Sequence, residues 1–92
     1  MKIRVKFMSF LSNITETSGY MVQVPCKTVE DVLDHLFEQF PQLKQELFDS
    51  SGELDYIYQI VLNGNRVLYP ADKQLPVAPG DELVFFAIVG GG

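Results

Sequence analysis

The length, composition and charge of this chain exclude several classes of protein. It has 92 residues, of which 47% are hydrophobic, and its 7 basic and 12 acidic side chains give a net charge of −5. This balance disfavours binding to nucleic acid or to anionic membranes, which require clustered basic side chains, and the single cysteine excludes an internal disulfide and a multi-cysteine metal cage. We expect one domain over residues 1–92, in the cytoplasm, with no signal peptide, no membrane span and no metal.

The first quarter of the chain predicts two strands separated by a loop. Apolar and basic side chains alternate over residues 3–7, which is typical of a half-buried strand. Serine, threonine, asparagine and glycine are frequent over residues 8–19, so we expect a loop there. The alternation resumes over residues 20–24 and stops at Pro25, which predicts a second strand that forms a hairpin with the first.

The clearest pattern in the sequence is that of an amphipathic helix. Its apolar residues recur at helical spacing on one face, namely Val29, Val32, Leu33, Leu36, Phe37 and Phe40. Thr28 stands at the N-cap position, and Pro41 predicts that the helix ends near residue 40. A short second helical segment is predicted at about residues 41–48, followed by a loop.

The second half of the chain predicts three further strands. Residues 57–62 alternate, and Asn63-Gly64 is a strong turn signal that leads into a short strand over residues 66–69. After a long connection, residues 83–89 are nearly all apolar, as expected of a central strand. The order of elements favours an α+β fold, the β-grasp (ubiquitin-like) roll, in which a mixed sheet of about five strands packs on one main helix. The first and last strands are expected side by side at its centre.

Residues that could carry out catalysis within the chain itself are few. His35 is the only histidine and falls on the polar face of the predicted helix, where we expect a solvated surface side chain. Cys26 precedes that helix beside Lys27, and both Lys27 and the helix N-terminus would lower its thiol pKa, although an incidental thiol is the favoured interpretation. No pair of residues supports an enzyme that acts alone.

The end of the sequence is unusual because an apolar strand runs directly into Gly90-Gly91-Gly92. Glycine has no side chain to pack and loses conformational entropy when it is ordered, so these residues do not help a core. A segment without side chains is narrow, so an extended run of glycines can enter a narrow channel and present its carboxylate to an active site elsewhere. We expect a flexible tail over residues 87–92; a frayed terminus is the alternative.

Residues 79–92 combine a Pro-Gly-Asp-Glu turn, an apolar strand with paired aromatics and a terminal diglycine. Together with the opening strand over residues 3–7 and the turn Val61-Leu62-Asn63-Gly64, this pattern resembles the small subunit of molybdopterin synthase and, more broadly, the ubiquitin-like sulfur carriers. The resemblance implies that an ATP-dependent enzyme adenylates the Gly92 carboxylate and that a sulfur donor converts it to a thiocarboxylate. A larger catalytic subunit then uses this sulfur to build molybdopterin, with Gly90 and Gly91 threading the tail into its active site.

In that role the chain is a non-catalytic sulfur-donating subunit that binds no cofactor, and ATP is used by the activating enzyme. Alternatives from other classes stay open. The close alternative is a sulfur carrier for another product, such as thiamine, thiolated tRNA or a sulfur-containing amino acid, although residues 41–55 form a longer insertion than is typical of thiamine carriers. It could instead be a modifier that forms isopeptide bonds with lysines through Gly92, or an interaction domain with an inert tail.

Alternation on the last strand predicts a surface for the partner. If Phe85 faces the helix, then Val84, Phe86 and Ile88 face the side of the sheet that no second helix is left to cover. Apolar residues exposed in a patch mark a partner surface. We therefore predict that Val84, Phe86 and Ile88 dock the partner, with Arg66 as a further contact, and that the basic residues of the first strand lie on the same face.

Overall fold

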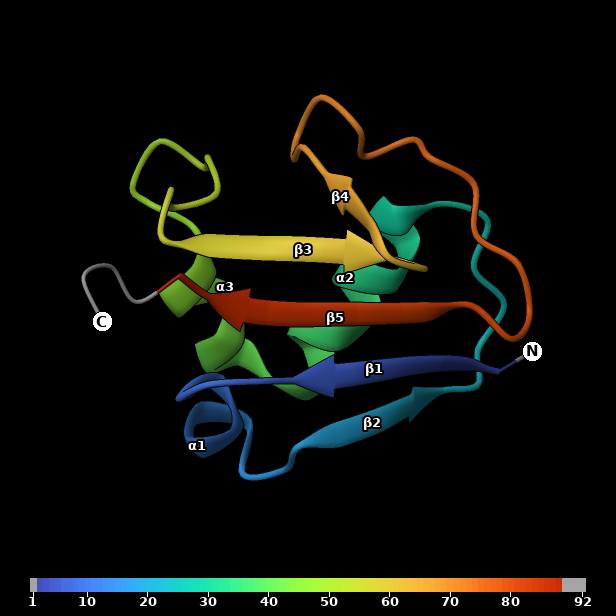
Figure 1. The fold of residues 1–92 in the computed structure, drawn as a ribbon, viewed down its shortest axis with the longest axis horizontal. Coiled ribbons are helices and arrows are strands. Elements are labelled where there is room, and N and C mark those ends of the chain that lie inside the picture. Colours follow the sequence, from blue (N-terminus) through green and yellow to red (C-terminus); the bar gives the residue numbers. More distant parts are fainter. Residues whose placement is uncertain (1, 89–92) are drawn as a thin grey trace.

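The computed structural model describes residues 2–88, which form a mixed sheet with helices packed on one side (Figure 1). In chain order the elements are β1 (Ile3–Phe7), α1 (Leu11–Thr15), β2 (Gly19–Val22), α2 (Val29–Gln39), α3 (Pro41–Leu47), β3 (Tyr58–Leu62), β4 (Asn65–Val67) and β5 (Glu82–Ala87). The strand order is β2-β1-β5-β3-β4, with β1 and β5 parallel and the other pairs antiparallel. The predicted β-grasp roll is confirmed, including the central pairing of the first and last strands.

The pairing of β1 with β5 decides which side chains enter the core. Val5 lies beside Leu83 and Phe7 beside Phe85 in the parallel register, and all four side chains are buried. Successive residues of a strand point to opposite faces of the sheet. Glu82, Val84 and Phe86 therefore lie on the face away from the helices, as predicted for Val84 and Phe86.

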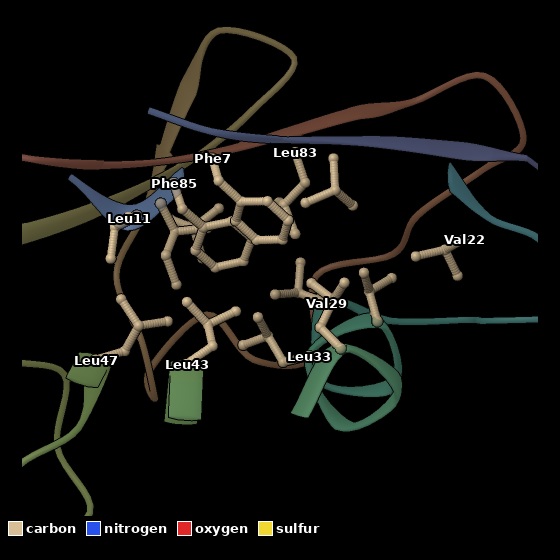
Figure 2. Packing of buried hydrophobic residues seen from close by; sticks show 14 of the residues in the cluster. Phe7, Leu11, Val22, Val29, Leu33, Leu43, Leu47, Leu83 and Phe85 are labelled. Carbon is tan, nitrogen blue, oxygen red and sulfur yellow. The ribbon is translucent and has the colours of Figure 1, made fainter. Parts of the chain in front are cut away.

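The core fills the space between the sheet and the helices α2 and α3 (Figure 2). At its centre the rings of Phe7 and Phe85 stack with centroids 5.8 Å apart, and Phe40 meets Phe7 edge to face at 5.5 Å. The helices contribute buried aliphatic side chains, namely Val29, Val32, Leu33, Leu36, Leu43 and Leu47. The predicted apolar stripe of α2 is thus buried, except that its last members, Phe37 and Phe40, are only half-buried at the margin of the core.

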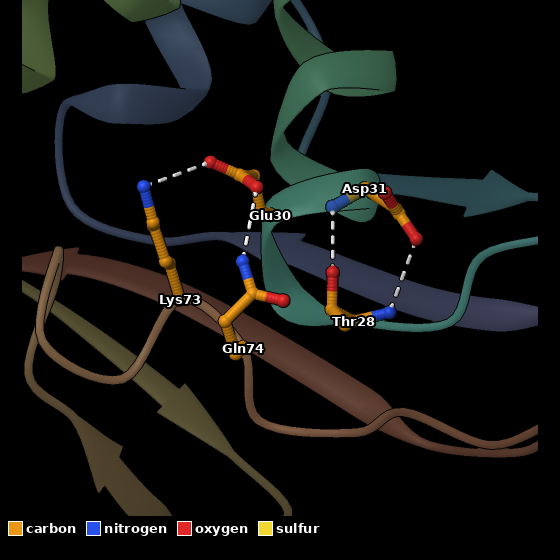
Figure 3. Close-up of polar contacts among 5 residues, drawn as sticks. All are labelled: Thr28, Glu30, Asp31, Lys73 and Gln74. Atoms are coloured by element: carbon orange, nitrogen blue, oxygen red, sulfur yellow. Dashed lines mark hydrogen bonds and ion pairs between the residues drawn. The ribbon is translucent and has the colours of Figure 1, made fainter.

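Helix α2 begins with a capping box, which Figure 3 shows. The hydroxyl oxygen of Thr28 accepts a hydrogen bond from the Asp31 amide at 3.3 Å, and the Thr28 amide donates to the Asp31 carboxylate at 3.2 Å. The first amides of a helix have no partner within the helix, so these bonds satisfy groups that would otherwise need water. The structure confirms Thr28 as the N-cap.

The long connection between β4 and β5 is attached to the same helix terminus. The amides of Val29 and Glu30 donate to the carbonyls of Leu75 and Lys73 at 2.9 and 3.0 Å. Side chains reinforce this attachment, because the Glu30 carboxylate forms an ion pair with Lys73 at 3.5 Å and accepts a hydrogen bond from Gln74 (Figure 3). The connection is therefore held by backbone and polar contacts across the start of α2.

The segment predicted as a loop after β1 contains the short helix α1. Leu11 and Thr15 are its buried residues, and the Thr15 hydroxyl donates to the Thr17 carbonyl at 2.7 Å. The helix ends at Glu16, whose φ of 62° is left-handed. A helix of 5 residues is too short to produce a visible apolar period, so its polar composition indicated a loop.

The two neighbouring phenylalanines of β5 provide a matched test of the two faces. We expect Phe85→Ala to lower the free energy of unfolding by about 3–5 kcal/mol, because it empties the centre of the core. Phe86→Ala should lower it clearly less, since its half-buried ring lies on the outer face. Denaturant unfolding of both variants measures the difference, and equal losses would contradict this assignment of faces.

Candidate functional site

The outer face of the sheet carries two of the predicted docking residues side by side along β5. Val84 lies between Lys6 of β1 and Val61 of β3, while Phe86 lies beside Gln59 of β3. Cross-strand neighbours point to the same side of a sheet, so these side chains share the face that the helices leave uncovered. Val61, Val84 and Phe86 are all half-buried and form an apolar strip across β3 and β5.

An open hollow of about 400 Å³ lies over this strip. We call it the sheet-face hollow; it is lined by Met8, Ser9, Val61, Gly64, Glu82, Val84 and Phe86. The structure therefore brings Val84 and Phe86 together as predicted and adds Met8 and Val61. Met8 follows the last residue of β1 and points outward like Arg4 and Lys6. The sequence would have predicted this if the alternation of residues 3–7 had been extended by one residue. Val61 depends on the pairing of β3 with β5, which the sequence does not reveal.

Positive charge flanks the sheet-face hollow on both sides. Arg66 of β4 pairs with Val61 in the register and is exposed, without an ion pair among residues 2–88. On the β1 side, Arg4 and Lys6 point outward, and the Lys6 ammonium lies 3.5 Å from the Glu82 carboxylate. This ion pair is largely exposed and adds little stability. The arrangement suits a partner whose rim is acidic.

The third predicted docking residue, Ile88, lies beyond the end of β5. Its amide donates to the Ile57 carbonyl, and its side chain is exposed but does not line the hollow. Ala87, the first residue of the predicted tail, is the last residue of β5 and is buried beside Tyr58. The sheet therefore holds the backbone through residue 88, whereas Gly90, Gly91 and Gly92 lie outside the described residues.

Asn63 fixes the start of the strand on which the hollow is built. Asn63 and Gly64 have φ values of 50° and 84°, as the two-residue hairpin turn between β3 and β4 requires. The Asn63 side-chain oxygen accepts from the Glu82 amide at 2.9 Å, and its amide group donates to the Asp81 carboxylate at 3.0 Å. One side chain thus ties the turn to the first residues of β5.

The family of the chain follows from comparison with known proteins. Residues 5–92 match the ThiS family, which is almost the whole chain. This chain belongs to the ThiS family of ubiquitin-like sulfur carriers. Over its full length it is 30% identical to SAMP1 from Haloferax volcanii, with a TM-score of 0.83 and complete coverage of both chains. A comparison with curated proteins found no match.

More distant structures share the fold. A putative molybdopterin converting factor, subunit 1, from Pyrococcus furiosus is 20% identical, with a TM-score of 0.77 and coverage of 97% of this chain and 99% of that chain. CysO in the BexX/CysO complex of Amycolatopsis orientalis is 21% identical, with a TM-score of 0.76 and coverage of 98% and 99%. The β-grasp frame of the carrier is therefore common to proteins of diverse sequence.

Neither reactive side chain of the carrier resides in a catalytic arrangement. Cys26 is 6% exposed, and burial together with the Asp31 carboxylate raises the pKa of its thiol, so that the activation by Lys27 and the helix N-terminus, the less favoured interpretation, is not supported. His35 is half-buried rather than solvated, with its ring nitrogen 3.3 Å from the Tyr20 hydroxyl. Within residues 2–88, no group of three histidine, cysteine or acidic side chains is placed to hold a metal ion, and no helix is long and apolar enough to cross a membrane.

The contacts of Asn63 predict its contribution to the stability of the carrier. We expect Asn63→Ala to lower the free energy of unfolding by about 1–3 kcal/mol, because it leaves the Glu82 amide without its partner and places alanine at a left-handed φ. The matched control is Asn65→Ala on β4, an exposed residue for which we expect a change within about 0.5 kcal/mol. Equal losses in denaturant unfolding would show that the Asn63 contacts do not hold β5.

Proposed function

We propose that this carrier holds sulfur as a thiocarboxylate on Gly92 and donates it for molybdopterin synthesis in complex with a larger catalytic subunit. The observation that carries the carrier role is the ThiS family match, which runs through residue 92 and so includes the terminal glycines. The choice of molybdopterin rests on the turn, paired aromatics and diglycine of residues 79–92. We place this activity in the cytoplasm, where ATP is available to the activating enzyme.

The proposed chemistry explains why the carrier needs no catalytic side chain of its own. A carboxylate is a poor electrophile, so the activating enzyme transfers AMP from ATP to Gly92 and releases pyrophosphate. A sulfur donor at the hydrosulfide level then displaces AMP and leaves a thiocarboxylate. Its nucleophilic sulfur attacks an electrophilic carbon of the acceptor and displaces an oxygen leaving group, which forms a thioester. Water then cleaves the acyl–sulfur bond, which leaves the sulfur on the acceptor as a thiol and restores the carboxylate. Tethering supplies a high effective concentration of sulfur at the acceptor site.

The geometry supports a division between a docking surface and a reacting end. Phe86 and Val84 lie on β5, the strand that leads directly to the glycines. Residues 88–92 span at most roughly 18 Å when fully extended. A partner seated on the sheet-face hollow must therefore place its active site within that distance of the end of β5. The same limit applies to the activating enzyme and to the larger subunit.

A modifier of proteins is the second candidate function. The observation in its favour is the 30% identity to SAMP1, which stands for small archaeal modifier protein 1. In this role a lysine amine would attack the adenylated Gly92 carbonyl and displace AMP, forming an isopeptide bond. Both functions use the same adenylated end, so the fate of the acyl group distinguishes them.

The fate of Gly92 is the first prediction to test. After incubation of the full chain with ATP, a candidate activating enzyme and a sulfur donor, we expect tandem mass spectrometry to localise one sulfur-for-oxygen replacement on Gly92. Fragmentation is required because oxidation of methionine or cysteine changes the mass almost equally. Deletion of Gly91 and Gly92 should abolish the modification and leave the unfolding midpoint unchanged.

Each result has a defined meaning when the activating enzyme is first shown to work on a known carrier. Sulfur on Gly92, followed by its transfer to a pyranopterin precursor with a larger subunit, establishes the molybdopterin role. Sulfur on Gly92 without that transfer assigns the carrier to another product. A branched peptide that joins Gly92 to a lysine supports the modifier, and an unmodified Gly92 contradicts both.

The docking surface is tested by a charge placed on the sheet-face hollow. We expect Phe86→Asp to weaken binding to the larger subunit about 30-fold, which corresponds to roughly 2 kcal/mol, because a carboxylate replaces an aromatic anchor that the partner would cover. The control is Met21→Asp, on the same outer face but on the edge strand β2 and outside the hollow. Titration calorimetry measures both affinities, and equal losses would move the interface away from Phe86.

A further inference from the structure

The helical side of the molecule carries a second and larger hollow, of about 620 Å³. It opens between α2, α3, the segment that follows α3 and Tyr69, which comes after β4. Its lining shares no residue with the sheet-face hollow and belongs to the side that α2 and α3 cover (Figure 1). We call it the helix-side groove; no step of the sulfur chemistry uses it.

Three aromatic rings in mutual contact line the helix-side groove. Phe37 and Phe48 meet edge to face with centroids 5.5 Å apart, and Phe48 and Tyr69 lie 5.3 Å apart at an angle of 54°. All three side chains are half-buried, so part of each ring stays accessible. Aromatic faces carry partial negative charge and attract cations, and this attraction strengthens where water is partly displaced.

Two carboxylates stand beside these rings. Asp34 of α2 is exposed and has no hydrogen-bond or ion-pair partner among residues 2–88. Asp49 directs one oxygen to the hydroxyl and amide of Ser51 and to the Glu53 amide, and these bonds hold the pKa of Asp49 below its usual range. Its second oxygen has no partner in the described part of the chain. Asp49 is therefore a fixed negative charge with an acceptor still available.

The other charges near the groove do not cancel this negative field. Burial, followed by the negative charges of Glu30 and Asp34 on α2, raises the pKa of Tyr69. Within residues 2–88, Glu30 alone among these acids has an ion-pair partner, which is Lys73. Lys44 is the single basic side chain in the lining, against Asp34 and Asp49.

We propose that the helix-side groove is a docking site for an arginine side chain of a second partner protein. A guanidinium is planar, stacks on aromatic rings and donates paired hydrogen bonds to carboxylates, so it matches both components of the groove. A lysine ammonium is more strongly hydrated and has no plane to stack. The proposal goes beyond the carrier role, because it adds a second partner. The basic flanks of the sheet-face hollow suit an acidic partner, whereas the acidic helix-side groove suits a basic one. The carrier can thus contact a basic protein through its helices while its sheet face is engaged.

The test titrates the full ¹⁵N-labelled chain with the peptide N-acetyl-Gly-Arg-Gly-amide and follows backbone amide shifts. We expect saturable shifts confined to the groove, at Lys44, Phe48 and Tyr69. The citrulline twin of the peptide, which has the same shape without the charge, should cause none. The lysine twin should bind several-fold more weakly than the arginine peptide, and salt should weaken the binding of both.

Variants connect the binding to the groove. Asp34→Asn should raise the dissociation constant for the arginine peptide about five-fold, the loss expected for one charge-assisted hydrogen bond. The matched control is Glu38→Gln, which neutralises an exposed acid of the same helix outside the groove and should leave the constant unchanged. Phe48→Leu removes the central ring and should also weaken binding, with an unchanged spectrum elsewhere as evidence that it folds.

Several outcomes would overturn the proposal. Equal binding of the citrulline or lysine twin removes guanidinium recognition, and shifts on the sheet face remove the assigned location. If Asp34→Asn and Glu38→Gln raise the dissociation constant equally, the peptide responds to the net charge of the protein and not to a contact with Asp34. Groove shifts that grow with protein concentration in the absence of peptide would assign the groove to Arg4 or Arg66 of a second copy instead of a partner protein.

Discussion

The parallel register of β1 and β5 is the constraint on which the rest of the structure depends. It places Phe7 beside Phe85 inside the core and Lys6 beside Val84 outside it. A slip of one residue would exchange the two faces, burying charge and exposing the aromatic centre. The same pairing therefore stabilises the fold, defines the apolar strip of the sheet-face hollow and sets the direction in which the chain continues toward its glycines.

The two sides of the molecule differ in charge, although the chain as a whole is acidic. Arg4, Lys6 and Arg66 lie around the outer face of the sheet, whereas carboxylates such as Asp34 and Asp49 line the helical side. Complementary charge mainly governs the rate and specificity of association rather than its strength. With this division, each face disfavours partners whose charge has its own sign.

Local patterns predicted the elements well because strands and helices repeat over a few residues. The stripe of α2, its Thr28 cap and the Asn63-Gly64 turn are each readable within a short window. Prediction failed where a pattern was too short, as in α1, or where a contact joined distant segments. His35 illustrates the second case, since Tyr20, which is distant in the sequence, partly covers the histidine.

The sequence by itself determined the class of fold and the alternation that places Val84 and Phe86 on the outer face of the sheet. It also determined the terminal glycines that belong to the carrier's proposed chemistry. Only the tertiary structure decided that Val61 completes the sheet-face hollow, that Ile88 lies outside it, and that Tyr69 joins Asp34 in the helix-side groove. The physical reason is the distance along the chain between the residues that interact. Periodicity and capping arise from neighbours along the chain, whereas register and hollows arise from side chains that meet only after the sheet and helices have packed.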